Sequence, residues 1–252
     1  MLANSIRITM PVRGAPFAIG THFSAHSFRH TQFEGAMDPL LMVDHFRMTE
    51  PTFGPHQHAG FSAVTYVFED SRSAHLNSDS LGNDLPITPG SLHWMVAGRG
   101  VTHDEWPDGD NPEVHGLQFF VDLPVSQKQI EPYAVHLESE DVPTYSDNGI
   151  RVRVVAGEFG DICSPVRLPQ PFSILDGFLD AQAQLNIQME HGWGAWIYAI
   201  NGTLSISAED ETVELTQGLA IALDGFSDGD QLRIIARTDC HFIVMRGKSV
   251  RS

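Results

Sequence analysis

GPHQHAGF, residues 54–61, opens the segment on which the fold of this chain depends, and GRGVTHDE, residues 98–105, closes it. In the first stretch, two histidines lie two positions apart. Side chains of an extended strand alternate between its faces, so His56 and His58 share one face if residues 54–61 form a strand. The glycines at both ends are typical of short strands joined by tight turns.

The second stretch repeats this spacing with His103 and Glu105. Two such pairs on neighbouring strands can converge and supply three imidazole nitrogens and one carboxylate. This donor set suits a divalent first-row metal and leaves coordination positions open. His93 is an alternative third histidine, because it follows a Pro-Gly turn. It has no acidic partner two residues on, so the prediction favours His103.

The composition is that of a folded protein with an acidic surface. The chain has 252 residues, 42% hydrophobic and 19% charged, and its net charge is −17 with only two lysines. Such a surface repels phosphate backbones and anionic lipid, so we expect neither direct nucleic-acid binding nor membrane binding. The two cysteines form no CxxC motif, no apolar stretch is long enough to span a membrane, and the N-terminus lacks the pattern of a signal peptide. We therefore expect a reducing, cytoplasmic location.

Short apolar segments separated by turns recur along the whole chain, and no helical pattern exceeds about two turns. Residues 63–68 exemplify the predicted strands, residues 75–83 a polar turn region, and residues 126–131 a short helix or linker. The alternation of short apolar segments and turns resumes after this linker. It predicts two all-β domains, each a barrel or a sandwich, at residues 1–132 and 133–252. The second half has no His-x-His and no paired His and Glu, so the first half is expected to carry the chemistry.

Other histidines are interpreted as structural. His45 follows a buried-strand run, and His115 begins a later strand beside the predicted site. In the second half, His191 precedes a Gly-Trp pair and His241 follows a cysteine, and neither has a neighbouring ligand at strand spacing. We expect these four to pack or to hydrogen-bond rather than to bind a metal.

Beyond these spacings, the chain resembles the pirins, a family of bicupins. The resemblance covers most of the chain and rests on the segments DPLLMVDHF (38–46), PHQHAGF (55–61), VTY (64–66), PG (89–90), WMVAGRG (94–100), HDE (103–105), GLQ (116–118), EP (131–132), VP (142–143) and IYAING (197–202). It implies two cupin barrels, of the β-barrel or jelly-roll type, packed face to face with one metal in the first. The family's metal ligands fall on His56, His58, His103 and Glu105.

The resemblance also implies a function. Iron is the usual family metal, so Fe(II) is preferred here over Ni, Cu, Mn, Co or Zn. Some relatives open the ring of the flavonol quercetin with dioxygen, which predicts a quercetinase-like oxidoreductase with a small aromatic substrate and O2. In this reading Glu105 is the catalytic base. The alternative is a non-enzymatic, metal- or redox-responsive regulator that acts through a protein partner, because animal pirin is a nuclear transcriptional co-regulator.

The sequence departs from the family pattern at two positions. The usual His-Pro-His-Arg-Gly-Phe-Glu has an arginine and a glutamate where this chain has Ala59 and Ser62. Ser62 also stands where many cupins have a carboxylate ligand, which leaves Glu105 to supply it. The two changes put the choice of substrate in question more than the binding of metal.

Overall fold

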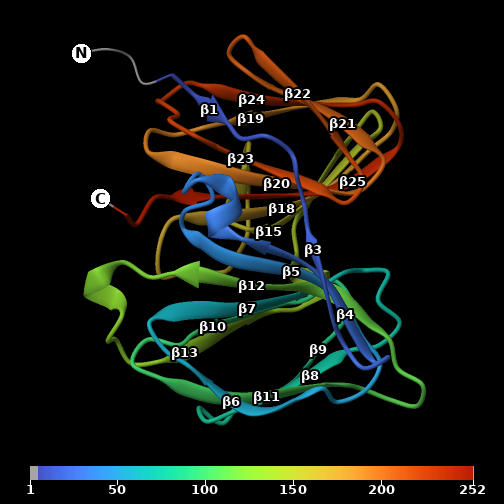
Figure 1. Ribbon diagram of the computed structural model, residues 1–252, viewed down its shortest axis with the longest axis vertical. Helices are drawn as coiled ribbons and strands as arrows, with labels where there is room; N and C mark the ends of the chain where they lie inside the picture. Colours follow the sequence, from blue (N-terminus) through green and yellow to red (C-terminus); the bar gives the residue numbers. More distant parts are fainter. Residues whose placement is uncertain (1–4, 252) are drawn as a thin grey trace.

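The computed structural model describes residues 5–251, and nearly all its regular structure is β-strand. Figure 1 shows two β-barrels, the lower one built mainly from the first half of the chain and the upper one mainly from the second. The described residues contain three 3-10 helices, which are η1 (His30–Phe33), η2 (Val125–Gln127) and η3 (Ser139–Asp141). The all-β prediction of two facing cupin barrels is confirmed, and no helix within residues 5–251 is long and apolar enough to cross a membrane.

The first barrel consists of a seven-stranded sheet, in the order β13-β10-β7-β12-β5-β4-β3, and a four-stranded sheet, in the order β6-β11-β8-β9. Their strands are β3 (Ala15–Ile19), β4 (Phe23–Arg29), β5 (Leu40–Met48), β6 (Phe53–His58), β7 (Phe61–Val67), β8 (His75–Asp79), β9 (Asp84–Ile87), β10 (Leu92–Val96), β11 (Val101–Pro107), β12 (Val114–Asp122) and β13 (Tyr133–Leu137). All these pairings are antiparallel, as expected for strands joined by short turns.

The second barrel has an eight-stranded sheet, a four-stranded sheet in the order β19-β24-β21-β22, and the small hairpin β16-β17. The large sheet runs β1-β23-β20-β25-β18-β15-β14, with β2 also paired to β23. The strands are β1 (Arg7–Ile8), β2 (Val12–Arg13), β14 (Thr144–Asp147), β15 (Ile150–Ala156), β16 (Glu158–Phe159), β17 (Ile162–Cys163), β18 (Phe172–Leu179), β19 (Gln184–Gln188), β20 (Trp193–Asn201), β21 (Thr203–Ala208), β22 (Glu211–Thr216), β23 (Leu219–Asp224), β24 (Gln231–Ala236) and β25 (Cys240–Lys248).

The two barrels share strands across the middle of the sequence. The N-terminal strands β1 and β2 pair with β23 of the second barrel, and β13, which follows residue 132, pairs with β10 of the first. Strands from both sides of the predicted boundary at residue 132 thus complete each barrel. The division into residues 1–132 and 133–252 stays a prediction.

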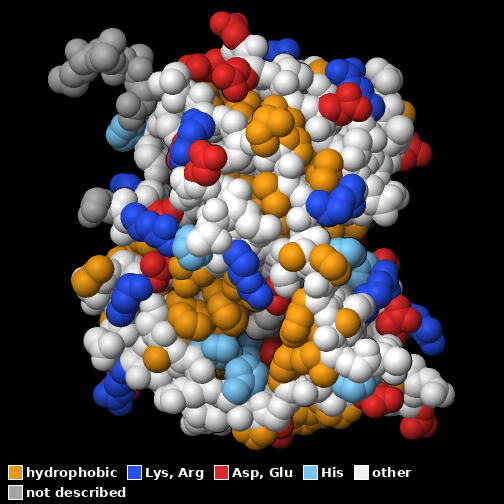
Figure 2. Space-filling view, viewed as in Figure 1, with side chains coloured by type: hydrophobic (Ala, Val, Ile, Leu, Met, Phe, Trp, Pro, Cys, Tyr) orange, Lys and Arg blue, Asp and Glu red, His pale blue; other side chains and the backbone are white. Residues whose placement is uncertain are grey.

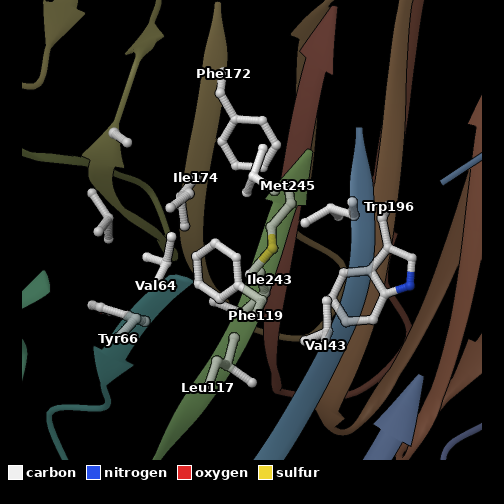
Figure 3. Close-up of a cluster of buried hydrophobic side chains, with 14 of the residues drawn as sticks. Val43, Val64, Tyr66, Leu117, Phe119, Phe172, Ile174, Trp196, Ile243 and Met245 are labelled. Atoms are coloured by element: carbon white, nitrogen blue, oxygen red, sulfur yellow. The ribbon is translucent and has the colours of Figure 1, made fainter. Parts of the chain in front are cut away.

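The largest hydrophobic core lies between the barrels, where the two large sheets face each other. Figure 3 shows side chains of the first barrel, Leu117 and Phe119 among them, packed against Ile174, Trp196 and Met245 of the second. Residues of β7 alternate between this core and the interior of the first barrel, and both environments are apolar over most of their area. This double burial explains the nearly continuous apolar run at residues 63–68.

A row of polar side chains crosses the inner face of the seven-stranded sheet. Cross-strand register places Ser27 beside Asp44, Asp44 beside Gln118, Gln118 beside Thr65 and Thr65 beside His93. The row separates two small apolar clusters, one containing Phe46 and Val67 and the other Ala63 and Met95. The interior of the first barrel is thus divided by a polar band, unlike the continuous apolar core of the second.

A hydrogen-bonded chain also joins the barrels at the edge of their interface. The Asp70 carboxylate accepts from His115 Nδ1 at 2.7 Å, so His115 Nε2 is left to accept from His45 Nε2 at 2.7 Å. His45 Nδ1 then accepts from the Tyr198 hydroxyl of the second barrel, again at 2.7 Å. Each ring nitrogen in this series thus acts either as a donor or as an acceptor. The hydrogen-bonded residues border an inter-barrel cavity of about 650 Å³.

Candidate metal centre

The four predicted ligands lie on two paired strands of the first barrel. In the antiparallel register of β6 and β11, His103 lies opposite His56, and Val101 lies opposite His58. The register shifts before Glu105, which lies opposite Phe53, so β6 contains an extra residue at its Gly-Pro pair. Such β-bulges change the direction of side chains next to them, and a proline fits there because it has no N–H for the ladder.

Three imidazole nitrogens meet at this point. His103 Nε2 lies 3.0 Å from His58 Nε2 and 3.1 Å from His56 Nε2. Among the described residues, His56, His58 and His103 form a group whose donor atoms all lie within 4.8 Å of one another. The structure therefore brings three of the four predicted donors together, through the spacing of two on β6 and the register between β6 and β11.

Hydrogen bonds on the far side of two rings fix which nitrogen faces the centre. His56 Nδ1 donates to the Gly54 carbonyl at 2.9 Å, and His103 Nδ1 donates to Asn77 Oδ1 at 3.2 Å. When both rings are neutral, their Nε2 atoms have no proton and direct lone pairs at each other. This is the arrangement that positions histidine ligands in metal proteins.

Burial favours the neutral form of His58 and His103. Desolvation, with a smaller effect from neighbouring imidazoles, lowers the pKa of His58 to about 4 and that of His103 to about 4. The ring of His58 also packs at steep angles against Phe61 and Phe120, with centroids 5.4 and 5.1 Å away. Neutral, fixed imidazoles are the form that binds a metal ion.

The geometry of the three nitrogens fits a transition-metal ion. For a metal–nitrogen bond of about 2.1 Å, two donors at right angles lie about 3.0 Å apart. The observed separations of 3.0 and 3.1 Å match this value. Facing lone pairs repel each other, and a cation between them removes the repulsion. The donor set of this centre thus fits a metal through His56, His58 and His103.

Glu105 lies beside the three histidines but outside their group. Its Oε2 is 3.9 Å from His103 Nε2, and its Oε1 accepts from the Thr65 hydroxyl at 2.9 Å. The side chain is buried, and Oε1 also faces His75 Nδ1 at 3.8 Å. One carboxylate oxygen is thus held by the wall of the barrel, and the other points toward the histidines. Its assignments as fourth ligand and as catalytic base stay predictions.

A cavity of about 270 Å³ leads to this centre. Its polar lining is His56, His58, His75, Glu105, Gln118 and Asp44, and its apolar lining is Phe17, Phe23, Met42, Phe46, Met48, Phe53 and Phe120. In Figure 2, histidine side chains lie in a hollow of the lower barrel with hydrophobic side chains around it. Apolar, largely aromatic side chains combined with convergent polar groups are typical of binding sites for small molecules.

The prediction of a turn region at residues 75–83 was wrong for residues 75–79. Residues 75–79 form the strand β8, which pairs with β11 so that Asn77 lies opposite Glu105. His75 and Asn77 point inward and are buried, and both ring nitrogens of His75 have no hydrogen-bond partner among the described residues. Inward polar side chains resemble turn residues in a sequence; the signal that could have identified the strand is their spacing of two.

The other residues that the sequence suggested as possible ligand positions lie away from the three-histidine centre. His93 is buried on β10 and is not part of the three-histidine group. Ser62 lies opposite Val96 and Val121, which face the inter-barrel core, so a carboxylate there would not point toward the centre. Of the described residues that line the cavity, none is Ala59 or Ser62.

Comparison with known proteins gives matches along most of the chain. The family model named Pirin matches residues 8–121. Pirin of Homo sapiens is 34% identical over 218 residues, which are 85% of this chain and 73% of the human protein. Identity at this level over this length reflects common descent and a shared fold.

Solved structures agree with the fold. The quercetin 2,3-dioxygenase of Acinetobacter baumannii superposes with a TM-score of 0.85 at 22% identity, covering 98% of this chain and 88% of that one. Bacterial pirin YhhW of Escherichia coli, solved in complex with nickel(II), has a TM-score of 0.72 at 18% identity over 97% of this chain and 100% of its own. At these identities the likeness shows the architecture of two facing cupin barrels.

Proposed function

Because this chain belongs to the pirin family, we propose that it is a metal-dependent dioxygenase that opens a ring of a flavonol or a related aromatic enol. The observation that carries the proposal is the three-histidine centre at the end of a cavity lined by aromatic side chains. The likeness of the whole fold to an enzyme named quercetin 2,3-dioxygenase supports the choice of substrate class.

The proposed metal is Fe(II), held by His56, His58 and His103 with Glu105 as a fourth ligand or as a neighbouring base. The solved complex of YhhW with nickel(II) supports a divalent metal without deciding which metal this chain uses. When bound, a divalent metal would act as a Lewis acid that acidifies a substrate hydroxyl and brings the substrate and dioxygen together. Both oxygen atoms enter the products in such a reaction, so no external reductant is required.

The residues of the chain then have separate tasks. Glu105 accepts the proton of the enolic hydroxyl at Oε2, because Oε1 is occupied by the Thr65 hydroxyl. The phenylalanine and methionine side chains of the cavity bind the rings of the substrate and exclude water. Asn77 and the Gly54 carbonyl hold two imidazoles in the required orientation.

Anaerobic loading with Fe(II), followed by oxygen uptake with quercetin, tests the activity, with the metal-free protein as the blank. The proposal predicts oxygen consumption together with a ring-opened product that mass spectrometry identifies. Full metal loading without oxygen uptake from quercetin or simpler flavonols would contradict the proposed reaction and favour the regulatory alternative.

The ligand assignment has its own test. His56→Ala combined with His103→Ala should reduce the metal content from one equivalent per chain to background, because two of three nitrogen donors are lost. His93→Ala is the matched control, since it removes another buried histidine of the same barrel. Circular dichroism checks that the strands remain. Full metal loading of the double variant would refute the assignment.

A further inference from the structure

The cavity has a second polar position, separate from the histidines. Asp44 lies on β5 between Met42 and Phe46 on the same inward face, and all three line the cavity. It belongs to the polar row across the seven-stranded sheet, next to Gln118 and two strands away from Thr65. With strands about 4.8 Å apart, Asp44 lies roughly 10 Å along the wall from Thr65, which contacts Glu105.

The carboxylate of Asp44 is incompletely satisfied. The residue is only 8% exposed, and its Oδ1 accepts from the Ser27 hydroxyl at 2.6 Å. The nearest cation, Arg29 Nη1, is 3.7 Å from the same Oδ1, and the Arg29 side chain is half exposed. Within residues 5–251, Oδ2 has no hydrogen-bond partner. Burial raises the pKa of Asp44 above its ordinary value, against the opposing effect of Ser27.

Oδ2 is not among the fully buried atoms that lack a partner, and Asp44 lines the cavity, so this oxygen is open to it. A ligand that covers the oxygen and cuts it off from water binds unfavourably unless the ligand itself supplies a donor. Gln118 lies beside Asp44, and the neighbouring Met42 and Phe46 of the cavity wall are apolar. The donor therefore fits best as a small group on an otherwise apolar molecule. A ring hydroxyl has this chemistry. A molecule of two or three aromatic rings is long enough to reach from the histidines to Asp44.

Building on the proposed function, we propose that Asp44 determines substrate specificity by accepting a hydrogen bond at Oδ2 from a ring hydroxyl remote from the metal-binding end of the substrate. The site thus selects polyhydroxylated aromatic enols over those whose only hydroxyl is the one at the metal. Ser27 positions the carboxylate through Oδ1, and the role of Asp44 is in binding rather than in the chemical step.

The test compares two ligands that share the chelating end. Quercetin has hydroxyls on its outer rings, whereas 3-hydroxyflavone has the chelating hydroxyl alone. Dissociation constants are measured without oxygen by quenching of tryptophan fluorescence, with Zn(II)-loaded and with metal-free protein. The wild type should prefer quercetin by about tenfold or more, as expected for a hydrogen bond to a charged acceptor.

Asp44→Ala should reduce this preference to near one, and Asp44→Asn should reduce it partly, because an amide keeps an uncharged acceptor. Asp108→Asn, on the exposed surface after β11, is the matched control and should keep the wild-type preference. An unchanged preference in Asp44→Ala would overturn the proposal. An equal loss of affinity for both ligands would overturn it too, since Asp44 would then only shape the cavity. Equal binding of the two ligands by the wild type, a comparison that needs no variant, would do the same.

Oxygen uptake separates this inference from the proposed function. If the loaded wild type consumes no oxygen, the oxygenase activity fails, while the ratio of dissociation constants still decides the role of Asp44. If uptake is normal and the ratio does not depend on Asp44, only the specificity inference fails. If neither ligand binds to the wild type, the flavonol class and the role of Asp44 both fail.

Discussion

The buried side-chain amide of Asn77 determines which ring nitrogen of His103 faces the other two histidines. Asn77 is fully buried on β8, and its Oδ1 accepts the proton of His103 Nδ1. Without this acceptor, His103 could carry its proton on Nε2, the nitrogen that faces the other two histidines. In the proposed metal centre, the free energy of metal binding would therefore depend on a residue that is not itself a ligand.

Asn77→Ala should weaken metal binding by about 10- to 100-fold, the usual effect of removing a partner of a ligand histidine. Asn77→Asp, which keeps an acceptor oxygen, should retain more of the affinity. Competition with a chelator of known affinity measures both. Asn83→Ala, in the turn after β8, is the control. Equal affinity of Asn77→Ala and the wild type would show that the amide does not position His103.

At the level of single residues, the sequence predicted the three histidines that the structure brings together, and it missed the residues that orient their rings. His56 and His58 follow from period two, because a strand places alternate side chains on one face, and His103 was selected by its pairing with Glu105 at the same spacing. Asn77 could not be identified this way, since its strand has polar residues on the inward face, where apolar ones are normally expected. Its role depends on the register between β8 and β11, which no local pattern encodes.

Among the elements, β5, β12 and β20 are linked by the chain of hydrogen bonds through His45. Burial, aided by the neighbouring His115, lowers the pKa of His45 to about 3. An imidazole in an unfolded chain has a pKa of about 6.5. Between these values the unfolded state binds more protons than the folded state, so stability is complete above about pH 6.5 and is lost as the pH falls toward about 3.

The free energy of unfolding should therefore fall by up to about 1.4 kcal/mol per pH unit for this histidine in acid. Urea unfolding of the metal-free protein between about pH 7.5 and pH 4.5 measures the slope. His45→Asn should make the slope shallower, whereas His191→Asn, at an exposed position, should leave it unchanged. If the slope of His45→Asn equals that of the wild type, His45 does not contribute to the acid sensitivity.

The sequence predicted strands best where both faces of the strand are buried. The continuous apolar run of β7 identifies a strand whichever face meets the core. The bulge in β6 could be suspected from its Gly-Pro pair, but its effect on the alignment of Glu105 required the pairing with β11. Sequence patterns thus predict strands more readily than the register that aligns them.

The whole molecule is held together by the core between its barrels. Phe119 is fully buried there and meets the edge of Trp94, with ring centroids 6.2 Å apart. Side chains of both large sheets belong to the same cluster. A cavity in this core removes contacts from both barrels, so the two should unfold together.

Phe119→Ala should lower the free energy of unfolding by about 3–5 kcal/mol, the usual cost of deleting a buried aromatic ring. Calorimetry should show one transition at a lower temperature. Val125→Ala, at a position that is 83% exposed, is the control and should change little. Two separate transitions, with only one displaced, would show that the barrels are independent units.

The pairing of β1 with β23 has a consequence for synthesis. Arg7 on β1 donates to Asp224 on β23, 217 positions later in the chain. At about 5–20 residues per second, the ribosome needs roughly 10–40 s to make that length. Throughout this time the partner of β1 does not exist, and contacts between residues so distant in sequence also slow refolding. Of the described strands, β1 is therefore synthesised first but can pair only after β23 has been made.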